Sequence, residues 1–301
     1  MPAPVALFAY NRPWHLEQTV TALSQNLLAH ETDLIIFSDG ARNEKDQASV
    51  KEVRRYIRSI QGFRTITFRE SPVNKGLARS VIDGVTEVLN DHDSVVVLED
   101  DMVTSRYFLS YMNEGLLLYA NDESVISIHG YMYPVREKLP EYFFLKGAHC
   151  WGWATWRRGW KLFERDGAVL LKTLQARALE REFDYEDAYP FTDMLRRQIQ
   201  GLNDSWAIRW HASAFLKDKL TLYPGISLLK NIGFDDSGTN SVSSDKVYDV
   251  AMDERPVILR KISAVENANA RKALSRFFKS IKPTLVKRVL NKLHSWLSKN
   301  S

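Results

Sequence analysis

The chain has 301 residues, of which 45% are hydrophobic and 26% charged, so it can build a sizeable core in one large domain or two modest ones. Its single cysteine, Cys150, excludes an internal disulfide framework and indicates a reducing compartment. No stretch reaches the roughly 18 apolar residues of a membrane span. The first residues also lack the pattern of a signal peptide, so we expect a cytoplasmic protein.

The net charge of +4 is unevenly distributed along the chain. Nine basic and no acidic residues occur from residue 271 onward, which leaves −5 (+4 minus 9) for residues 1–270. Apolar residues such as Phe278 and Trp296 alternate with these basic residues, and Pro283 divides the segment. We therefore expect residues 266–301 to form a basic amphipathic helical tail on an anionic membrane surface. The alternative is a helix that packs on the body or on another subunit. The acidic body argues against nucleic-acid binding.

Strand and helix patterns alternate through the first 128 residues. We expect strands over 5–10, 34–37, 64–69, 94–98 and 125–128, and helices over 13–28, the charged segment before residue 60, 77–89 and 105–119. This alternation predicts a mainly parallel α/β sheet, whose ligand crevice lies at the carboxyl ends of the strands. Polar residues at those ends should line it: Asn11, Arg12, Asp39, the 74–79 region and 99–101. The fingerprints GxGxxG and GxxxxGK[ST] are absent.

Three acidic residues, Glu99, Asp100 and Asp101, directly follow the apolar run Val95–Leu98. A run of this kind is typical of a strand that is buried on both faces. Carboxylates this close together repel one another and cannot sit unpaired in a core, so they should emerge at the strand's carboxyl end. Oxygen ligands suit Mg²⁺ or Mn²⁺, which indicates a metal site. The alternative is an acidic turn in solvent.

Aromatic residues become dense from residue 129 onward. Trp151, Gly152 and Trp153 could form a platform on which a sugar ring stacks, and Gly152 suggests that something approaches the backbone closely. The alternative is a packed core in which each tryptophan N–H has a partner.

Two further polar segments could complete a site. Asp204 is a candidate catalytic base, and the alternative is that it caps the helix that starts there. The glycine-rich segment 231–241, with Asn231, Gly233 and Gly238, could be a lid over a phosphate-bearing ligand or a plain linker. A strand is expected just before it, over 220–223.

Five of these elements together resemble inverting glycosyltransferases of the GT-A fold, most closely the N-acetylglucosaminyltransferase I family. The similar segments are Ala9–Arg12, Ser38–Gly40, Val96–Asp101, Gly152–Trp153 and Asp204–Trp206. They occur in the family's order and span about residues 5–241. The resemblance implies a GT-A (Rossmann-like) fold with a mixed, mainly parallel sheet flanked by helices. Residues 1–128 would bind the nucleotide-sugar, and residues 129–265 would form the acceptor-binding and catalytic half of the same domain.

The resemblance also implies roles for the matching residues: Arg12 and Asp39 hold the nucleoside, Asp100 meets the ribose, Glu99 meets the donor sugar, Asp101 binds Mn²⁺ or Mg²⁺, Asp204 is the general base, and 231–241 closes over the diphosphate. We also assign Arg79 to donor binding. The donor would be a UDP-sugar and the acceptor a glycan or lipid-linked saccharide. The donor sugar and the linkage do not carry over, because the segment around Trp151 is richer in tryptophan than in the animal enzymes.

The family's eukaryotic Golgi form has an N-terminal anchor, for which we see no pattern here. The basic tail instead looks like that of a bacterial enzyme at the inner face of the cytoplasmic membrane, working in surface polysaccharide or lipopolysaccharide synthesis. Two other functions stay open. A metal-dependent nucleotidyltransferase would also use a parallel sheet with acidic residues, and a non-catalytic carbohydrate-binding protein at the membrane would need only the tryptophans and the tail.

Overall fold

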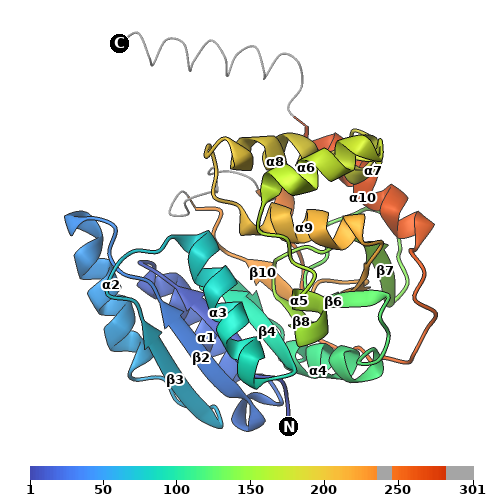
Figure 1. The fold of residues 1–301 in the computed structure, drawn as a ribbon. Helices are drawn as coiled ribbons and strands as arrows, with labels where there is room; N and C mark the ends of the chain where they lie inside the picture. Colours follow the sequence, from blue (N-terminus) through green and yellow to red (C-terminus); the bar gives the residue numbers. More distant parts are fainter. Residues whose placement is uncertain (236–245, 283–301) are drawn as a thin grey trace.

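A computed structural model describes residues 1–235 and 246–282 (Figure 1). One eight-stranded sheet, in the order β3-β2-β1-β4-β8-β6-β9-β7, runs through the molecule, and β5 and β10 form a separate pair. The strands are β1 (Val5–Ala9), β2 (Asp33–Ser38), β3 (Thr65–Glu70), β4 (Ser94–Glu99), β5 (Met102–Thr104), β6 (Val125–His129), β7 (Tyr142–Lys146), β8 (Trp153–Trp156), β9 (Leu220–Pro224) and β10 (Leu229–Asn231).

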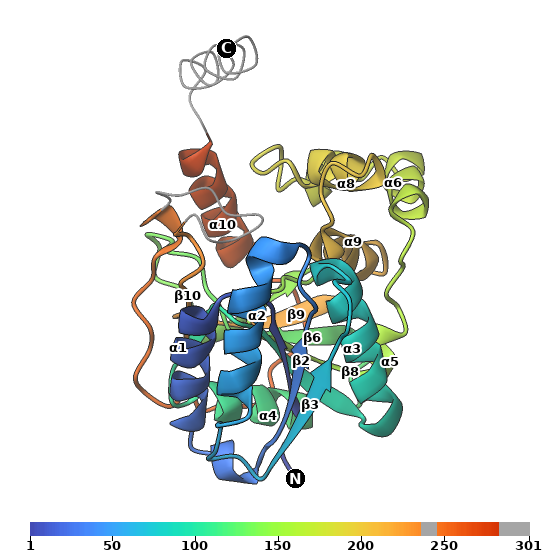
Figure 2. The same cartoon turned by 90° about the vertical axis from the view of Figure 1, so that its left-hand side faces the viewer.

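Helices pack on both faces of this sheet (Figures 1 and 2). The α-helices are α1 (Pro13–Ser24), α2 (Glu44–Ile57), α3 (Leu77–Asp91), α4 (Phe108–Leu118), α5 (Arg157–Trp160), α6 (Gly167–Ala176), α7 (Glu180–Phe183), α8 (Phe191–Ile199), α9 (Trp206–Leu216) and α10 (Ala268–Ile281). Short 3₁₀ turns cover Ala29–Glu31 and Lys246–Tyr248.

The buried strand β1 shows how sequence pattern produces these layers. All five of its residues are buried, because successive side chains point to opposite faces and helices cover both. Val5 and Leu7 pack into the cluster beneath α1, whereas Ala6 and Phe8 pack into the cluster beneath α3. β1 pairs in parallel with β2 and β4, so the carboxyl ends of these three strands meet at one edge.

The predicted fold class is confirmed: the structure has a mixed, mainly parallel sheet flanked by helices. β1 to β4 and β6 fall within a few residues of the expected strands, and β9 matches the strand expected over 220–223. The pattern did not predict β5, β7, β8 or β10. β8 lies between β4 and β6, so the sheet continues across the boundary placed at residue 128.

The second half adds a layer of helices beyond the end of the sheet. Figure 1 shows α6, α7, α8 and α10 gathered there around α9. They close over a second apolar cluster that includes Leu174, Phe183, Leu195 and Phe215.

The start of the predicted tail belongs to this cluster. Helix α10 buries Ala270, Leu274 and Phe278 against the body, so its apolar face is used inside the protein. This corrects the expectation for residues 268–281 in favour of the packing alternative. Residues 283–301, with Pro283 and Trp296, lie outside the described residues, and for them the membrane prediction stays a prediction. Among the described helices, none is long and apolar enough to cross a bilayer.

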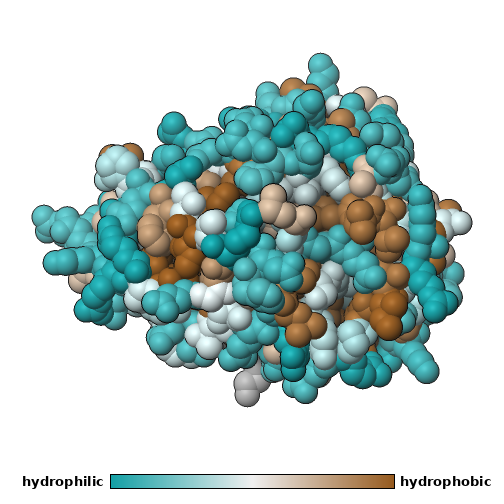
Figure 3. Space-filling model, turned by 90° about the horizontal axis from the view of Figure 1, so that it is seen from below, coloured by the Kyte–Doolittle hydropathy of each residue, from teal (hydrophilic) through white to brown (hydrophobic). Residues whose placement is uncertain are grey.

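The face that bears the N-terminus and α4 carries apolar side chains in separate areas among hydrophilic ones (Figure 3). Leu117 of α4 is one of the exposed apolar residues of the chain. Apolar areas that are broken up in this way are common on soluble proteins and need no partner.

Candidate functional site

An arginine and two aspartates meet at the carboxyl ends of β1 and β4. The parallel register places Phe8 opposite Glu99, so the chain leaving β1 passes beside the acids that follow β4. The Arg12 guanidinium donates through Nη2 to Asp100 Oδ1 and, over 2.8 Å, to Asp101 Oδ2. Both aspartates are buried, with 3% and 8% of their surface exposed. The predicted juxtaposition of Arg12 with the acidic motif is therefore present.

One arginine does not compensate three carboxylates. Burial raises the pKa of Glu99 to about 8, and the charges of Asp101 and Asp100 act in the same direction against Arg12. Burial likewise raises the pKa of Asp100 to about 6, although Arg12 lowers it. Burial disfavours the Arg12 charge, but the neighbouring Asp100 and Asp101 outweigh it and raise the pKa of Arg12. Full ionisation of the group would leave a net charge of −2, which a divalent cation would balance.

Asp101 offers one oxygen for such a cation. Its Oδ2 accepts from Arg12, whereas its Oδ1 is buried and has no hydrogen-bond partner in the part of the chain that the structure describes. Among the described residues, no group of three or more His, Cys, Asp or Glu side chains is arranged to hold a metal. The chain therefore fits a hard cation only if most ligands come from elsewhere. Mg²⁺ is commonly bound by one or two carboxylates, substrate phosphates and water, so a single free carboxylate oxygen is compatible with such a site.

Gly233, from the segment after β10, lies over Asp101. β10 pairs antiparallel with β5, and this pairing brings Asn231 opposite Met102 and the Ile232 N–H to within 2.9 Å of the Asp101 carbonyl. A Cβ at Gly233 would stand 2.1 Å from Asp101 Oδ2 and 3.0 Å from Arg12 Nη1. Only glycine can lie this close, so the segment after β10 belongs to the same site as the acids.

The described residues of the predicted lid, up to residue 235, make further contacts of their own. The Asn231 side chain accepts from the Gly233 N–H over 2.8 Å, and Phe234 stacks on Tyr248 with ring centroids 5.1 Å apart. Asp235 Oδ2 lies 2.9 Å from Nε2 of the buried His15. The sequence did not point to His15 or Tyr248. Gly238 falls outside the described residues, so closure of this segment stays a prediction.

Asp39 holds a neighbouring loop in place. Its buried carboxylate accepts backbone N–H groups of Lys75 at 2.8 Å and Gly76 at 2.9 Å, and the Asn74 amide at 3.1 Å. These donors come from the loop after β3, some 35 residues along the chain. Asp39 therefore shapes the crevice at the end of β2, and a contact with uracil stays a prediction.

Asp204 does not cap a helix. The side chain of the next residue, Ser205, accepts the Ile208 N–H and begins α9. The Asp204 side chain is 68% exposed, and its Oδ1 lies 4.0 Å from Arg209 Nη2. Its Oδ2 stands 3.5 Å from the position a Cβ would take on Gly76, the residue that bonds to Asp39. Asp204 is thus an available carboxylate beside the Asp39 loop.

Arg79 lies near Asp204 rather than near the acids. Its side chain is exposed and pairs with Asp83 one turn along α3, over 3.5 Å. Both line a groove of about 320 Å³ together with Asp204 and Arg209. No described contact joins Arg79 to Arg12 or to Asp101, so its role in donor binding stays a prediction.

The predicted aromatic platform needs correction. Trp153 lies in β8 with 0% exposure and packs between Trp160, Trp206 and Trp210 at centroid distances of 5.5 to 5.9 Å, so it offers no face to a sugar. The group that approaches Gly152 closely is the side chain of Leu229, which would stand 2.0 Å from a Cβ at this position. Trp151 alone is half-buried, in edge contact with Phe234 and Tyr248.

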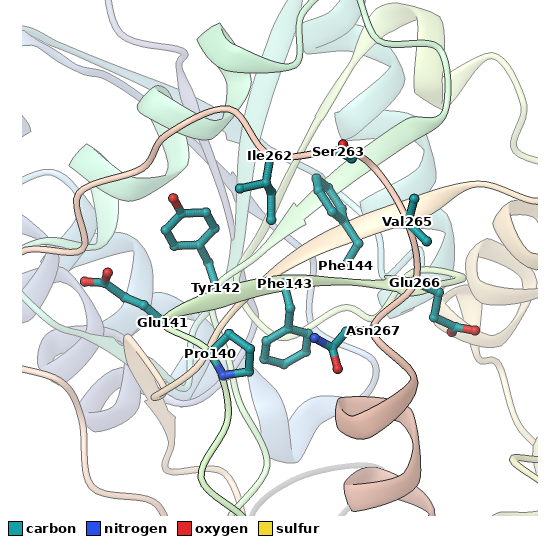
Figure 4. Close-up of a pocket in the computed structure, with 10 residues that line it drawn as sticks. All are labelled: Pro140, Glu141, Tyr142, Phe143, Phe144, Ile262, Ser263, Val265, Glu266 and Asn267. Atoms are coloured by element: carbon teal, nitrogen blue, oxygen red, sulfur yellow. The ribbon is translucent and has the colours of Figure 1, made fainter.

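A separate cavity of about 530 Å³ lies beside β7, the last strand in the sheet order (Figure 4). Tyr142 and Phe144 of β7 line it from one side, and Ile262 and Val265 line it from the other. β7 is four strands away from β4, which amounts to about 19 Å at the usual strand spacing. None of the predicted site residues lines this cavity, so we do not assign the proposed chemistry to it.

Comparison with known proteins gives similarity of structure only. No family model and no curated protein matches the sequence. Residues 1–349 of S. aureus TarS align at 10% identity and TM-score 0.42, over 78% of this chain and 62% of that one. The mannosyltransferase PcManGT from Pyrobaculum calidifontis, in complex with GDP-Man and Mn²⁺, aligns at 14% identity and TM-score 0.37, over 72% of each chain.

Glucosyl-3-phosphoglycerate synthase from Mycobacterium tuberculosis, in complex with Mn²⁺, UDP and glucosyl-3-phosphoglycerate, aligns at 15% identity and TM-score 0.33, over 59% of this chain and 67% of that one. The chain spans only a quarter of the length of a longer TarS structure. None of these proteins is described as an N-acetylglucosaminyltransferase I, so that narrower resemblance stays a prediction.

Proposed function

We propose that the chain is a metal-dependent glycosyltransferase of the GT-A fold, which moves a sugar from a nucleotide donor, expected to be UDP-linked, to an acceptor hydroxyl. The observation that carries this proposal is the buried Asp101 carboxylate: its Oδ2 lies beside Arg12 and beneath Gly233, and its Oδ1 has no hydrogen-bond partner among the described residues. A carboxylate oxygen held in this way, in a group short of positive charge, suits a divalent cation that also binds a diphosphate.

Each residue of the site has a physical task in this proposal. When bound, Mn²⁺ or Mg²⁺ would supply positive charge to the diphosphate leaving group. Asp101 would hold that ion through Oδ1, and Arg12 keeps Asp100 and Asp101 in place. Asp39 fixes the 74–76 loop that walls the crevice. Glu99, whose pKa is raised by burial, would contact the donor sugar.

We assign the role of general base to Asp204. The acceptor oxygen forms a bond to the anomeric carbon while the bond from that carbon to the diphosphate oxygen breaks, and the hydroxyl proton passes to the Asp204 carboxylate. Displacement from the opposite face in one step inverts the configuration and needs no covalent intermediate. The exposure of Asp204, which is free of any capping role, supports this assignment.

Further parts of the prediction stay proposals. We place the enzyme at the inner face of the cytoplasmic membrane, bound through the basic residues that follow 282, and in surface polysaccharide or lipopolysaccharide synthesis. A glycan or lipid-linked saccharide would be its acceptor.

Thermal shift measurements with UDP, GDP and CMP, each with and without Mn²⁺, test the function. At 100 times its dissociation constant, UDP with Mn²⁺ should raise the melting temperature by roughly 5 °C, and UDP alone should do much less. Asp101→Asn should abolish this shift, whereas the matched variant Asp93→Asn, at an exposed acid before β4, should keep it. An equal shift without Mn²⁺, or an unchanged shift in Asp101→Asn, would refute the metal role.

The products distinguish the enzyme classes. Incubation with a UDP-sugar and Mn²⁺ should release UDP. Without an acceptor the release should be slow, because the sugar is then transferred to water. Release of pyrophosphate from UTP and a sugar phosphate would instead indicate a nucleotidyltransferase, and glycan binding without UDP binding would indicate a carbohydrate-binding protein.

A further inference from the structure

A groove of about 320 Å³ lies between the starts of α3 and α9 and the turn that follows α5. Three arginines, Arg79, Arg165 and Arg209, line it together with the two aspartates Asp83 and Asp204. The five side chains carry a net charge of +1. This volume is at the lower end of small-molecule sites and suits a group about the size of one substituted sugar ring.

Arg209 is the buried charge of the groove. It is 9% exposed, and its Nε and Nη1 donate to the Ser205 and Arg165 carbonyls over 3.3 and 3.1 Å. Its Nη2 lies 4.0 Å from Asp204 Oδ1, beyond hydrogen-bond distance. Burial lowers the pKa of Arg209, which shows that its surroundings do not fully compensate the charge. An anion in the groove would supply the missing partner.

The other two arginines strengthen this field. Arg165 is exposed and, within the described part of the chain, its side chain has no hydrogen bond or ion pair. Arg79 has only Asp83, 3.5 Å away, and its side chain is 73% exposed. Helix α3 also begins here, and its N-cap residue Gly76 has no side chain to accept the first N–H groups. The positive end of the helix dipole therefore adds to the same field.

The charge balance shifts further during the proposed reaction. When Asp204 takes the acceptor proton it becomes neutral, and the groove then carries +2. An oxyanion on the acceptor would keep the groove close to neutral and would draw Arg209 away from Asp204, leaving that carboxylate free to receive the proton.

We propose that this groove binds the acceptor and that the acceptor carries a phosphate or carboxylate group close to the reacting hydroxyl. The inference rests on the proposed function, because Asp204 as the base makes this groove the acceptor side. Arg165 and Arg209 bind the oxyanion, and Arg79 lies at the rim.

Binding to the complex with UDP and Mn²⁺ tests this inference without turnover. Isothermal titration would compare glucose 6-phosphate, glucuronic acid and glucose as probes. At least one acid should bind at least tenfold more tightly than glucose, and the two acids distinguish a phosphate from a carboxylate. Arg165→Ala should lower the affinity for that acid by 10- to 100-fold and leave the affinities for glucose and UDP unchanged. Arg165→Lys should recover part of the lost affinity.

Arg197→Ala is the matched control, because Arg197 is an exposed arginine of α8 that does not line the groove. It should leave all the affinities unchanged. Equal binding of glucose and both acids, no binding of any acid, or no effect of Arg165→Ala would overturn the inference while the glycosyltransferase proposal stands. Weaker UDP binding in Arg165→Ala would assign the arginines to the donor and would also overturn it. Failure of UDP and Mn²⁺ to bind the unmodified protein would refute the proposed function itself.

Discussion

Two regions of the molecule, one at the carboxyl end of β4 and one beside the neighbouring strand β8, differ in what burial costs. At the end of β4, Glu99, Asp100 and Asp101 share one arginine and leave Asp101 Oδ1 without a partner. Beside β8, Trp153 packs against three other tryptophan rings and joins strands to α5 and α9. The first region loses stability because like charges repel one another there unless protons or a cation compensate them, and the second gains stability by burying apolar surface. Changes in the first should therefore affect binding and turnover, and changes in the second should affect folding.

Asp204→Asn should have the largest effect on turnover. The amide cannot accept the proton, so the rate of transfer should fall by about 10²- to 10⁴-fold. The side chain is exposed, so the melting temperature and the affinity for UDP should stay within error. Release of UDP from the donor in the presence of an acceptor, followed over time, measures the rate. A variant with at least a tenth of the normal rate would show that the base is another group, with Asp193 or Asp235 as the next candidates.

Trp153→Ala should have the largest effect on folding. Removal of a fully buried indole creates a cavity beneath β8 and should lower the free energy of unfolding by about 3–5 kcal/mol. Urea denaturation measures the loss, and Trp153→Phe should recover about half of it. If the alanine variant folded normally but lost sugar binding, Trp153 would belong to a binding platform rather than to the packed core.

Gly233→Ala should impair the donor site with little change in the fold. The added methyl would stand 2.1 Å from Asp101 Oδ2, so either the loop or the carboxylate must move. We expect the affinity for UDP with Mn²⁺ to fall by roughly 10-fold, a change of about 1.4 kcal/mol. Gly201→Ala is the control for a methyl added away from the site, because no atom lies within 4 Å of a Cβ there. The strain of its positive φ, which Gly233 does not share, should affect stability rather than the affinity for UDP. Equal UDP affinity in the two variants would show that this contact does not shape the site.

Asp33→Asn gives the smallest effect and shows what a compensated carboxylate does. Burial acts to raise the pKa of Asp33, but hydrogen bonds from Arg64 and Thr65 outweigh it and lower the pKa below its ordinary value. A lowered pKa in the folded state stabilises the protein above the unfolded pKa of about 3.9 and loses that contribution as the pH falls. The variant should lose less than about 1 kcal/mol at pH 7. This difference from the unmodified protein should shrink below about pH 4 in urea titrations, and a difference that grew would contradict the sign.

The first half of the fold was predictable because each element there carries its own signal. Val5–Ala9 and Val95–Leu98 are apolar runs of strand length, and Leu77–Asp91 repeats apolar residues at helical spacing. β5 and β10 have three residues each, too short for any pattern. β8 was missed because the sequence around Trp153 and Trp156 does not distinguish tryptophans packed in a strand core from tryptophans exposed at a binding surface.

The site was predictable only where its residues lie at strand ends. Arg12, Asp39 and Asp101 follow strands, so the parallel sheet brings them to one edge. The contact between Gly233 and Asp101 joins residues 132 positions apart (233 minus 101) through the β5–β10 pairing, which no local pattern encodes. Similarly, both Asp204 and Ser205 are residues that often cap helices, and only the geometry of α9 shows which of them does so.

Electron paramagnetic resonance of Mn²⁺ tests the central claim most directly, because the signal of the free aqueous ion disappears when the ion is bound. The unmodified protein should remove this signal only when UDP is also present, since Asp101 supplies one ligand and the diphosphate supplies others. UDP binds some Mn²⁺ by itself, so the reference is UDP with Mn²⁺ and no protein. Asp101→Asn should lower the signal no further than this reference, while Asp93→Asn behaves like the unmodified protein. Equal loss of the signal in Asp101→Asn, or no loss in the unmodified protein with UDP, would contradict a metal site at the end of β4.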